Sequence, residues 1–324
     1  MKTDHRRLGL TLALVFLSAL SGPVRAEYPD HIIKGVVPFT PGGATDLYAR
    51  VIAPYLSKAL GQTVVVENKG GAAGNIGMDS VAKSKPDGYT ILFNSSAATV
   101  NPAMFRKLPF DPIKDLQPVA MLSEAPTVVA VNTAKVPSKT LKEFVDLVKK
   151  NPGKFNAAAG GVGTQLPVEL FRLQNNLDMV VLLYKGAGDA VTAMVSGEAD
   201  CMIVTMPPLA PHIAAGRLRA LAVAGEKRLP AFPDVPTTRE AGMPDFTYGS
   251  AFGVYVRAGT PPEIVRKLNA TLNAITAMPE VADRVKRFGA TPLQKTPEEF
   301  TEAYHREIAR LKDVVARAKI QTVD

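Results

Sequence analysis

Three short segments combine glycine with small hydroxyl side chains, and each stands between a strand-like run and a helix-like run. They read FTPGGATD (39 to 46), NKGGAAGNIG (68 to 77) and AAAGGVGTQLP (157 to 167). Glycine lets backbone N–H groups line a concave turn, and a following helix adds unpaired first-turn donors and the positive end of its dipole. Each turn therefore has the chemistry of an anion-binding site.

These turns lack the residues that hold a nucleotide phosphate. A P-loop reads G-x-x-x-x-G-K-[ST], and neither Gly42–Gly43 nor Gly70–Gly71 leads into that lysine. The segment GGVGTQ also lacks the last glycine of the G-x-G-x-x-G dinucleotide fingerprint. A carboxylate needs only a few N–H or hydroxyl donors, so the turns favour a carboxylate over a nucleotide. The hydroxyl donors near them are Thr40, Thr45, Ser95, Ser96 and Thr164.

Asp46 closes the first of these turns and would repel an anion placed beside it. An aspartate at the start of a helix also stabilises that helix, because its carboxylate accepts backbone N–H groups and interacts favourably with the dipole. We expect Asp46 to cap the first helix, with direct ligand contact as the alternative.

Residues that could carry out catalysis are few. Beyond residue 26 the histidines are His31, His212 and His305, and no two of them have the spacing of metal ligands. There is no G-x-S-x-G nucleophile elbow, and Cys201 has no base near it in the sequence. The sequence therefore indicates binding more than turnover, without a cofactor or metal.

Strand-like and helix-like runs alternate along the chain. Strands are expected at IIKGVVPF, TVVVEN and YTILFN, with helices near 46–60, 76–84 and 99–105. Such alternation predicts parallel strands joined by helical crossovers, so the fold class is α/β. The strand-to-helix turns of a parallel sheet share its carboxyl edge, where ligands bind, and we therefore expect the glycine-rich turns to meet there.

A second α/β unit follows two strand-like runs, PVAMLS and TVVAVN, which Glu124-Ala125-Pro126 separates. The chain could pass from one sheet to another at that point. Thr140 and Glu143 form a capping box for the next helix. Further helices are expected near 166–176, 187–196 and 208–215. After a strand in TYGSAFGVYVRAG, two more helices are expected, capped at Thr260 and at Thr296.

The N-terminus has the pattern of a secretory signal peptide. Basic residues precede an uncharged apolar run from Leu8 to Leu20, which is too short to span a bilayer, and Val24-Arg25-Ala26 suits a signal peptidase. Cleavage after Ala26 leaves a formal charge of +5, with basic residues that are scattered and not interleaved with aromatics. We therefore expect an exported, soluble, monomeric protein that does not bind nucleic acid.

Several phrases resemble the Bug family, the periplasmic substrate-binding receptors of tripartite tricarboxylate transporters. They include YPDHIIKGVVPFTPGGATDLYAR, YKGAGDAVTAMVSGEADCM and AGTPPEIVRKLN. The most specific pieces are Asp87-Gly88-Tyr89-Thr90 and Pro233-Asp234-Val235-Pro236-Thr237 with Glu240-Ala241-Gly242. The resemblance runs from about Tyr28 to Ala303 and so covers most of the expected mature chain.

The resemblance implies a type II periplasmic-binding fold, in which two α/β domains close over a ligand between them. Signal peptide 1–26 would precede a discontinuous first domain, 27–124 with 250–324, and a second domain, 125–249. The hinge would lie at Glu124-Ala125-Pro126 and near Tyr248-Gly249. By the same resemblance the partners are a small carboxylate and the membrane permease subunits of a tripartite transporter, and the location is the periplasm.

In this family one ligand carboxylate is held by backbone groups and waters between two loops, and neighbouring turns approach the ligand. In this sequence the first loop matches Phe39, Thr40, Gly42, Gly43, Ala44, Thr45 and Asp46. The second loop matches Ala159, Gly160, Gly161, Val162, Gly163, Thr164 and Gln165, and the neighbouring positions are Asn75, Ser95, Ser96, Tyr184 and Thr205.

The second loop departs from the family pattern, which places a histidine three residues after G-x-G-T. Here Gln165 directly follows Gly161-Val162-Gly163-Thr164 and takes the place of the histidine, so two residues are missing. We expect Pro167 in the first turn of the next helix and a shifted pocket wall. The ligands of relatives should therefore not be transferred to this chain.

The expected function is capture of a small organic carboxylate, which could be a di- or tricarboxylate, an amino acid or an aromatic acid. A sensor that docks on a signalling partner would use the same cleft, so the sequence does not separate sensing from transport. A secreted α/β enzyme is a further alternative, against which the scarcity of catalytic residues counts.

Overall fold

The computed structural model describes residues 28–317 and 319–323. From His31 onward the chain forms one compact unit. The expected signal peptide and its cleavage point lie outside the described residues. Among the described residues, no helix combines the length and the apolar character that a membrane span requires.

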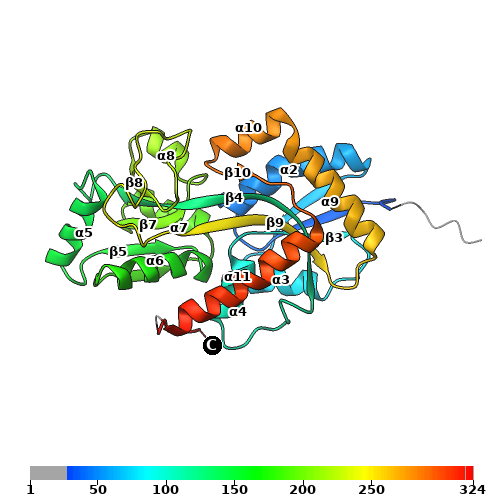
Figure 1. Ribbon diagram of the computed structural model, residues 1–324, viewed down its shortest axis with the longest axis horizontal. Helices are drawn as coiled ribbons and strands as arrows, with labels where there is room; N and C mark the ends of the chain where they lie inside the picture. The colour runs from blue at the N-terminus through cyan, green and yellow to red at the C-terminus, as the bar shows by residue number, and fades with distance from the viewer. Residues whose placement is uncertain (1–27, 318, 324) are drawn as a thin grey trace, which may run out of the picture. The chain divides into compact units, whose positions relative to one another are not determined.

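The strands form one sheet, in which the long strand Leu116–Asn132 runs through both parts and Gly249–Arg257 pairs antiparallel with its first part (Figure 1). The order is β2-β1-β3-β9-β4-β7-β5-β6, with β8 and β10 paired to β4. Pairs β1/β2, β1/β3, β5/β6 and β5/β7 are parallel, which confirms the expected α/β class. The strands are β1 (Ile33–Val37), β2 (Val64–Asn68), β3 (Thr90–Asn94), β4 (Leu116–Asn132), β5 (Asn156–Ala159), β6 (Val180–Leu183), β7 (Cys201–Thr205), β8 (Leu218–Val223), β9 (Gly249–Arg257) and β10 (Thr291–Pro292).

Strand β4 is continuous through Glu124-Ala125-Pro126, where the sequence suggested two separate runs. Its first part, Leu116 to Pro126, pairs with β9, and its last part, Thr127 to Asn132, pairs with β7 and β8. The strand therefore changes its pairing partners at this point, as expected, but it is not interrupted. We refer to the sheet around β1–β3 as the first half and to that around β5–β8 as the second half.

The helices cover the sheet and are mostly where the apolar periodicity placed them. The largest difference is a helix over residues 279–287 that the sequence pattern did not predict, because only Val281 and Val285 mark its buried face. The helices are α2 (Ala44–Leu60), η1 (Ala72–Gly74), α3 (Asn75–Ala82), α4 (Ala97–Met104), α5 (Leu141–Lys150), α6 (Val162–Gln174), α7 (Ala187–Ser196), α8 (Ala210–Ala214), α9 (Pro262–Ala277), α10 (Pro279–Arg287) and α11 (Pro297–Arg317).

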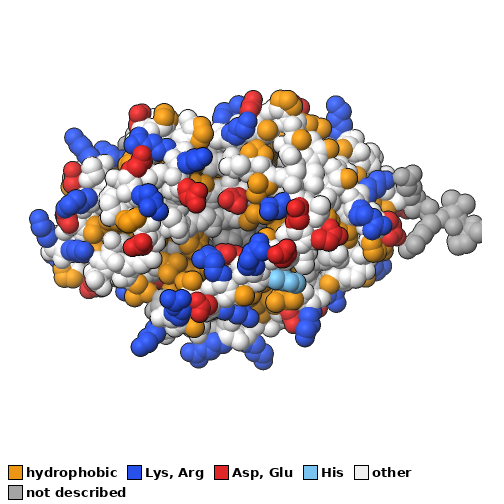
Figure 2. All heavy atoms as spheres, viewed as in Figure 1, with side chains coloured by type: hydrophobic (Ala, Val, Ile, Leu, Met, Phe, Trp, Pro, Cys, Tyr) orange, Lys and Arg blue, Asp and Glu red, His pale blue; other side chains and the backbone are white. Residues whose placement is uncertain are grey.

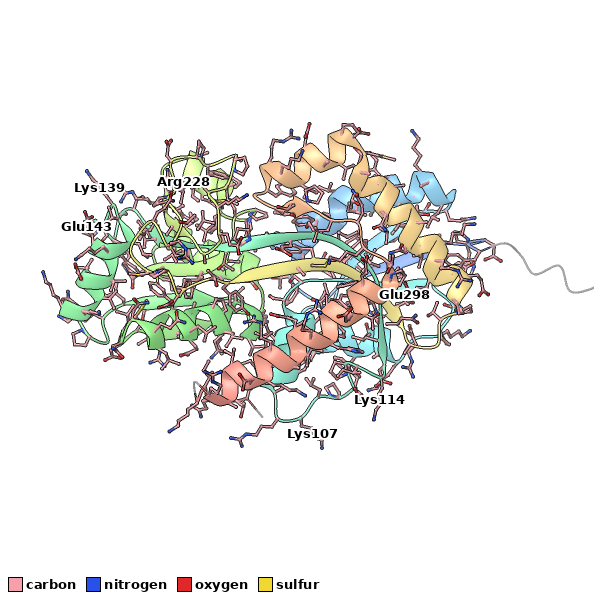
Figure 3. All side chains as sticks on the ribbon, viewed as in Figure 1. Lys107, Lys114, Lys139, Glu143, Arg228 and Glu298 are labelled. Carbon is pink, nitrogen blue, oxygen red and sulfur yellow. The ribbon has the colours of Figure 1, made fainter. Side chains whose placement is uncertain are left out.

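Two of the three expected threonine caps are confirmed. The N–H groups of Glu143 and Glu299 donate to the hydroxyls of Thr140 and Thr296, each at 3.2 Å. The cap at Thr260 is wrong, because α9 begins at Pro262 and the Thr260 hydroxyl instead donates to the carbonyl of Arg257 at 2.7 Å. The labelled Lys139 and Glu143, at the start of α5, lie at the far end of the second half (Figure 3).

Each half has its own apolar core. Phe144 and Phe171 pack in the second half against the buried face of β4 and β7, and Tyr255 and Tyr304 pack in the first half beneath α11. Between the halves, Tyr48 of α2 stacks on Phe252 of β9 with ring centroids 4.3 Å apart. This stack fixes the start of α2 against the strand that joins the halves.

Candidate ligand-binding cavity

A cavity of about 50 Å³ lies where the carboxyl ends of strands from both halves face each other. The first residues of α2, α4, α6 and α7 surround it, and β4, β7 and β9 form its floor. Its lining consists of Phe39, Gly43, Ala44, Thr45, Ser95, Ser96, Thr127, Gly160, Gly163, Thr164, Pro167, Ala187, Ile203, Val204, Thr205, Tyr248, Ser250 and Phe252.

The structure brings ten of the candidate site residues to this cavity and leaves nine outside its lining. The ten are Phe39, Gly43, Ala44, Thr45, Ser95, Ser96, Gly160, Gly163, Thr164 and Thr205. The nine outside are Thr40, Gly42, Asp46, Asn75, Ala159, Gly161, Val162, Gln165 and Tyr184.

The expectation that Asp46 caps the first helix is wrong, because Gly43 precedes α2 without a side-chain cap and Asp46 lies inside the first turn, outside the cavity lining. Its carboxylate accepts the Gly42 N–H at 3.0 Å and contacts Arg50 Nε at 3.0 Å and Asn68 Nδ2 at 2.9 Å. Burial by itself would raise the pKa of this carboxyl, but the hydrogen bonds from Arg50, Gly42 and Asn68 hold the pKa below its usual value. Asp46 therefore stays ionised and fixes the backbone that precedes α2.

The third glycine-rich segment, which contains the second loop of the family pattern, is helical from Val162 onward and not a loop. Gly161, with φ +95°, precedes α6, so residues 162–165 form the first turn of the helix. Pro167 is the sixth residue of α6, so its expected place in the first turn is wrong. A proline has no N–H for the carbonyl four residues earlier, which here belongs to Gly163. That carbonyl instead faces the Ser96 hydroxyl of the first half, at 3.5 Å.

Ser95 and Ser96, which precede α4, link the start of this helix to α2 and to β9. The Thr45 hydroxyl donates to Ser95 Oγ at 2.9 Å, and the Ser96 N–H donates to Ser250 Oγ at 3.1 Å. The hydroxyl protons of Ser95 and Ser250 have no acceptor among the described residues, and they are therefore available to a ligand.

The floor of the cavity contains most of the lining residues that the sequence did not indicate. Tyr248 precedes β9 and alternates with Ser250 and Phe252 of that strand, and the last three residues of β7, Ile203 to Thr205, complete the floor. Alternation on a strand that crosses a parallel sheet is a signal that could have identified them. Thr127 lies opposite Thr205 in the β4/β7 register, and its hydroxyl donates to the Tyr248 carbonyl at 3.1 Å.

Three polar candidates outside the lining have partners elsewhere. Asn75 accepts from Asn101 Nδ2 at 2.7 Å in a buried pair. The Tyr184 hydroxyl donates to Glu198 at 2.9 Å, and burial together with that carboxylate raises its pKa to about 12. The Thr40 hydroxyl donates to Asp189 of α7 at 3.2 Å, a contact between the two halves. These residues support the turns around the cavity.

Glycines allow the two halves to approach closely. A Cβ on Gly188 would lie 2.4 Å from the Pro41 carbonyl oxygen, and one on Gly186 would lie 2.3 Å from Thr40 Oγ1. Gly43 lies opposite Ala187, and a Cβ on Gly43 would lie 3.5 Å from that side chain. Backbone from both halves therefore encloses the cavity at a separation that side chains would prevent.

Charged groups lie outside this cavity. None of its described lining residues carries a charge, and no cluster of three or more His, Cys, Asp or Glu side chains in the described part of the chain could hold a metal ion. Burial raises the pKa of the Tyr248 phenol above its usual value, so this side chain is neutral. The Cys201 thiol is buried on β7, and its pKa is likewise raised by burial. The cavity offers hydrogen bonds and apolar contact, and no nucleophile with a base.

A larger groove of about 950 Å³ adjoins the cavity at Ser95, Ser96, Tyr248 and Ser250. Figure 2 shows it as a hollow in the middle of one face, with basic and acidic side chains on its rim. The labelled Arg228 on this rim pairs with Glu240 at 2.9 Å (Figure 3), and Arg310 pairs with Glu307 at 2.7 Å. These arginines are therefore already neutralised by partners.

The model of the tripartite tricarboxylate transporter family receptor, TctC, matches residues 48–320. The chain belongs to this receptor family. Protein BugT of Bordetella pertussis is 37% identical to this receptor over 315 residues, which cover 96% of each chain. The resemblance to the Bug family noted in the sequence is thereby confirmed.

Solved structures similar to this receptor include the periplasmic binding protein BugD, with 31% identity, a TM-score of 0.87 and coverage of 91% and 100% of the two chains. A protein of Rhodopseudomonas palustris solved with adipate is 31% identical, with a TM-score of 0.88 and coverage of 92% and 100%. MatC of the same organism, solved with malate, is 34% identical, with a TM-score of 0.85 and coverage of 89% and 100%. The fold is accordingly the two-domain periplasmic-binding fold expected from the resemblance.

Proposed function

We propose that this receptor captures a small organic carboxylate in the cavity between its halves and delivers it to the permease of a tripartite transporter. The observation that carries this proposal is the ring of four helix starts around an uncharged cavity. First-turn N–H groups have no partner within their helix, and the helix dipole attracts an anion there. The relatives solved with adipate and malate support a carboxylate ligand.

The proposed binding site comprises the lining residues, with the starts of α2 and α6 on opposite sides of the ligand. A ligand that contacts both halves stabilises the closed arrangement by its differential affinity for that arrangement. Domain boundaries at 124/125 and 249/250 place the hinge where β4 changes neighbours and β9 begins. The Thr127 N–H donates to the Tyr248 carbonyl at 2.8 Å and joins these two crossings.

The expected location is the periplasm, reached through a cleaved N-terminal leader. This location suits a receptor that binds solute before a membrane permease takes it up. Transport and sensing would use the same cavity, so the membrane partner separates them. Affinity capture with the ligand-bound receptor should recover permease subunits, and recovery of a signalling receptor alone would overturn the transport role.

Thermal unfolding tests the binding function directly. Purified, ligand-free receptor is melted with mono-, di- and tricarboxylates, amino acids and aromatic acids. A selective ligand raises the melting temperature, because it binds the native state and not the unfolded chain. At a hundredfold excess over the Kd, the expected stabilisation is about 2.7 kcal/mol. Absence of any shift across the whole panel would contradict carboxylate binding.

A further inference from the structure

We propose that the cavity selects a compact monocarboxylate over dicarboxylates and tricarboxylates. This inference rests on the proposed binding function and concerns which carboxylate the site accepts. Three observations support it, namely the balance of charge at the four helix starts, the chemistry of the floor and the size of the cavity.

The helix starts supply positive potential for about one carboxylate. Each helix N-terminus is equivalent to about half an elementary charge, and an acidic residue in the first turn offsets it. α2 carries Asp46 and α7 carries Asp189 in that turn. α4 and α6 have no acidic residue in their first turns. Only α4 and α6 therefore present uncompensated N-termini, which together amount to about one charge.

These two helix starts also meet at the cavity. A Cβ on Gly163 of α6 would lie 3.1 Å from Ser96 Oγ and 3.4 Å from the Ala97 nitrogen of α4. Gly163 thus brings backbone of α6 next to the first turn of α4, one helix from each half. A single carboxylate in the cavity beside this contact would lie near both helix starts, one from each half.

No cation lines the cavity itself, and Lys227 of the adjoining groove lies outside the lining, so a second carboxylate inside the cavity would have no cationic partner among the described lining residues. Arg50, the basic residue nearest in sequence to the first turn, is bound to Asp46 and donates to Asn68 at 2.9 Å. The arginines of the adjoining groove, Arg228 and Arg310, have acidic partners of their own. A second carboxylate inside the cavity would lose its water without gaining an ion pair, which is strongly unfavourable.

The floor favours an uncharged ligand body. Ile203, Val204 and Phe252 are each at most 4% exposed and present apolar surface, and the Pro167 ring adds to it from α6. Thr205 is 3% exposed, and its hydroxyl has no hydrogen-bond partner among the described residues. This hydroxyl suits a single neutral oxygen on the ligand, such as a hydroxyl or carbonyl group.

The size of the cavity limits the ligand to a short chain. One water molecule requires roughly 10–15 Å³ of such space, so about 50 Å³ corresponds to about four such molecules. A carboxylate with two or three further carbon atoms fills that space. A second carboxylate would have to meet the apolar floor or leave the cavity for the adjoining groove.

Matched pairs of acids test the proposal, because each pair differs by a methyl group in place of one carboxylate. The pairs are butanoate with succinate, 2-hydroxybutanoate with malate, and hexanoate with adipate. Dissociation constants are measured by calorimetry on the ligand-free receptor at fixed ionic strength. We expect the four-carbon monocarboxylates to bind at least tenfold more tightly than their dicarboxylate partners.

Equal or tighter binding of the dicarboxylates would overturn the selectivity while leaving the carboxylate receptor intact. Failure of every acid in these pairs and in the broader panel to bind would instead remove the proposed function itself. The two failures are therefore distinguishable in one set of measurements.

A charge variant tests the electrostatic reason separately. Asp189 is exposed and lies outside the lining, so Asp189→Asn should fold normally and leave the α7 N-terminus uncompensated. We expect succinate to gain at least threefold in affinity relative to butanoate. Glu263→Gln neutralises an exposed first-turn acid of α9, which lines neither the cavity nor the groove, and as the matched control it should leave the ratio unchanged. An unchanged ratio in Asp189→Asn would contradict the charge balance.

Discussion

At the scale of single residues, Pro167 shows how one side chain changes a site it was expected to border. The sequence pattern predicted that Pro167 lies in the first turn of a helix, where its missing N–H interrupts no hydrogen bond of the helix. It lies one turn further in, so the Gly163 carbonyl has no helical donor and faces Ser96 of the other half. The missing N–H of Pro167 in the second half thus leaves the Gly163 carbonyl available to accept from the Ser96 hydroxyl of the first half.

Asp46 leads to a prediction about stability and pH. Its folded-state pKa is depressed, so its contribution is fully present above the unfolded-state value of about 3.9 and is lost as pH falls through the folded-state pKa. Asp46→Asn should lower the free energy of unfolding by about 2 kcal/mol at pH 7. Urea unfolding from pH 7 down to pH 2 should show this difference shrinking below pH 4. A difference that stays constant down to pH 2 would rule out the carboxylate as its source.

At the scale of elements, the site depends on how closely α7 approaches the turn before α2. Gly186 and Gly188 face Thr40 and Pro41 across the halves, and neither has a positive φ that would itself require glycine. Glycine is needed at these two positions because a side chain would collide with the turn before α2, and not because the local backbone conformation requires it.

Gly188→Ala should therefore weaken ligand binding while the protein still folds. Its Cβ would lie 2.4 Å from the Pro41 carbonyl oxygen, so the halves must separate to accommodate it. Alanine is a better helix former than glycine by about 1 kcal/mol, which preserves α7. Calorimetry should show at least a tenfold loss of affinity, and small-angle scattering with ligand should show a more open molecule. Thr192→Ala on the same helix is the control, and a Gly188→Ala variant that binds as tightly as the parent would refute the role.

At the scale of the whole molecule, β4 and β9 make the two halves parts of one sheet. β9 pairs with β4 over Leu116 to Pro126, and the Thr127 N–H then bonds to Tyr248 just before β9 begins. The floor of the cavity is built from these crossings and β7. Ligand binding at the floor should consequently stabilise the molecule as a whole.

Cys201 provides a probe of this global coupling. It is the one cysteine of the chain, it is 2% exposed on β7, and burial raises the pKa of its thiol. We expect a thiol-reactive dye to label it only when the protein unfolds, and a bound carboxylate to slow labelling by the factor one plus the ratio of its free concentration to its Kd. Rapid labelling of the native receptor at neutral pH would show that the second half opens without global unfolding.

Much of the fold followed from local patterns. Apolar periodicity and capping boxes placed α5 and α11, since Thr140 and Thr296 satisfy donors within three residues of themselves. α10 was missed because its buried face is only two valines, and α6 began four residues earlier than expected because the chain after Gly161 is already helical. A buried face of only two residues and an internal proline obscure helix boundaries in a sequence.

The sequence by itself determined the α/β class, the family and the glycine-rich turns, because strand and helix periodicity and turn chemistry are local properties of the chain. Only the tertiary structure decided which residues line one cavity. Tyr248, Ser250 and Phe252 join Thr45 and Ser96 there although more than 150 residues separate them in sequence. It also showed that Asp46 turns away from the cavity, because its carboxylate is bound by Arg50 and Asn68. Packing and hydrogen-bond partners that are distant in sequence decide the direction of a side chain.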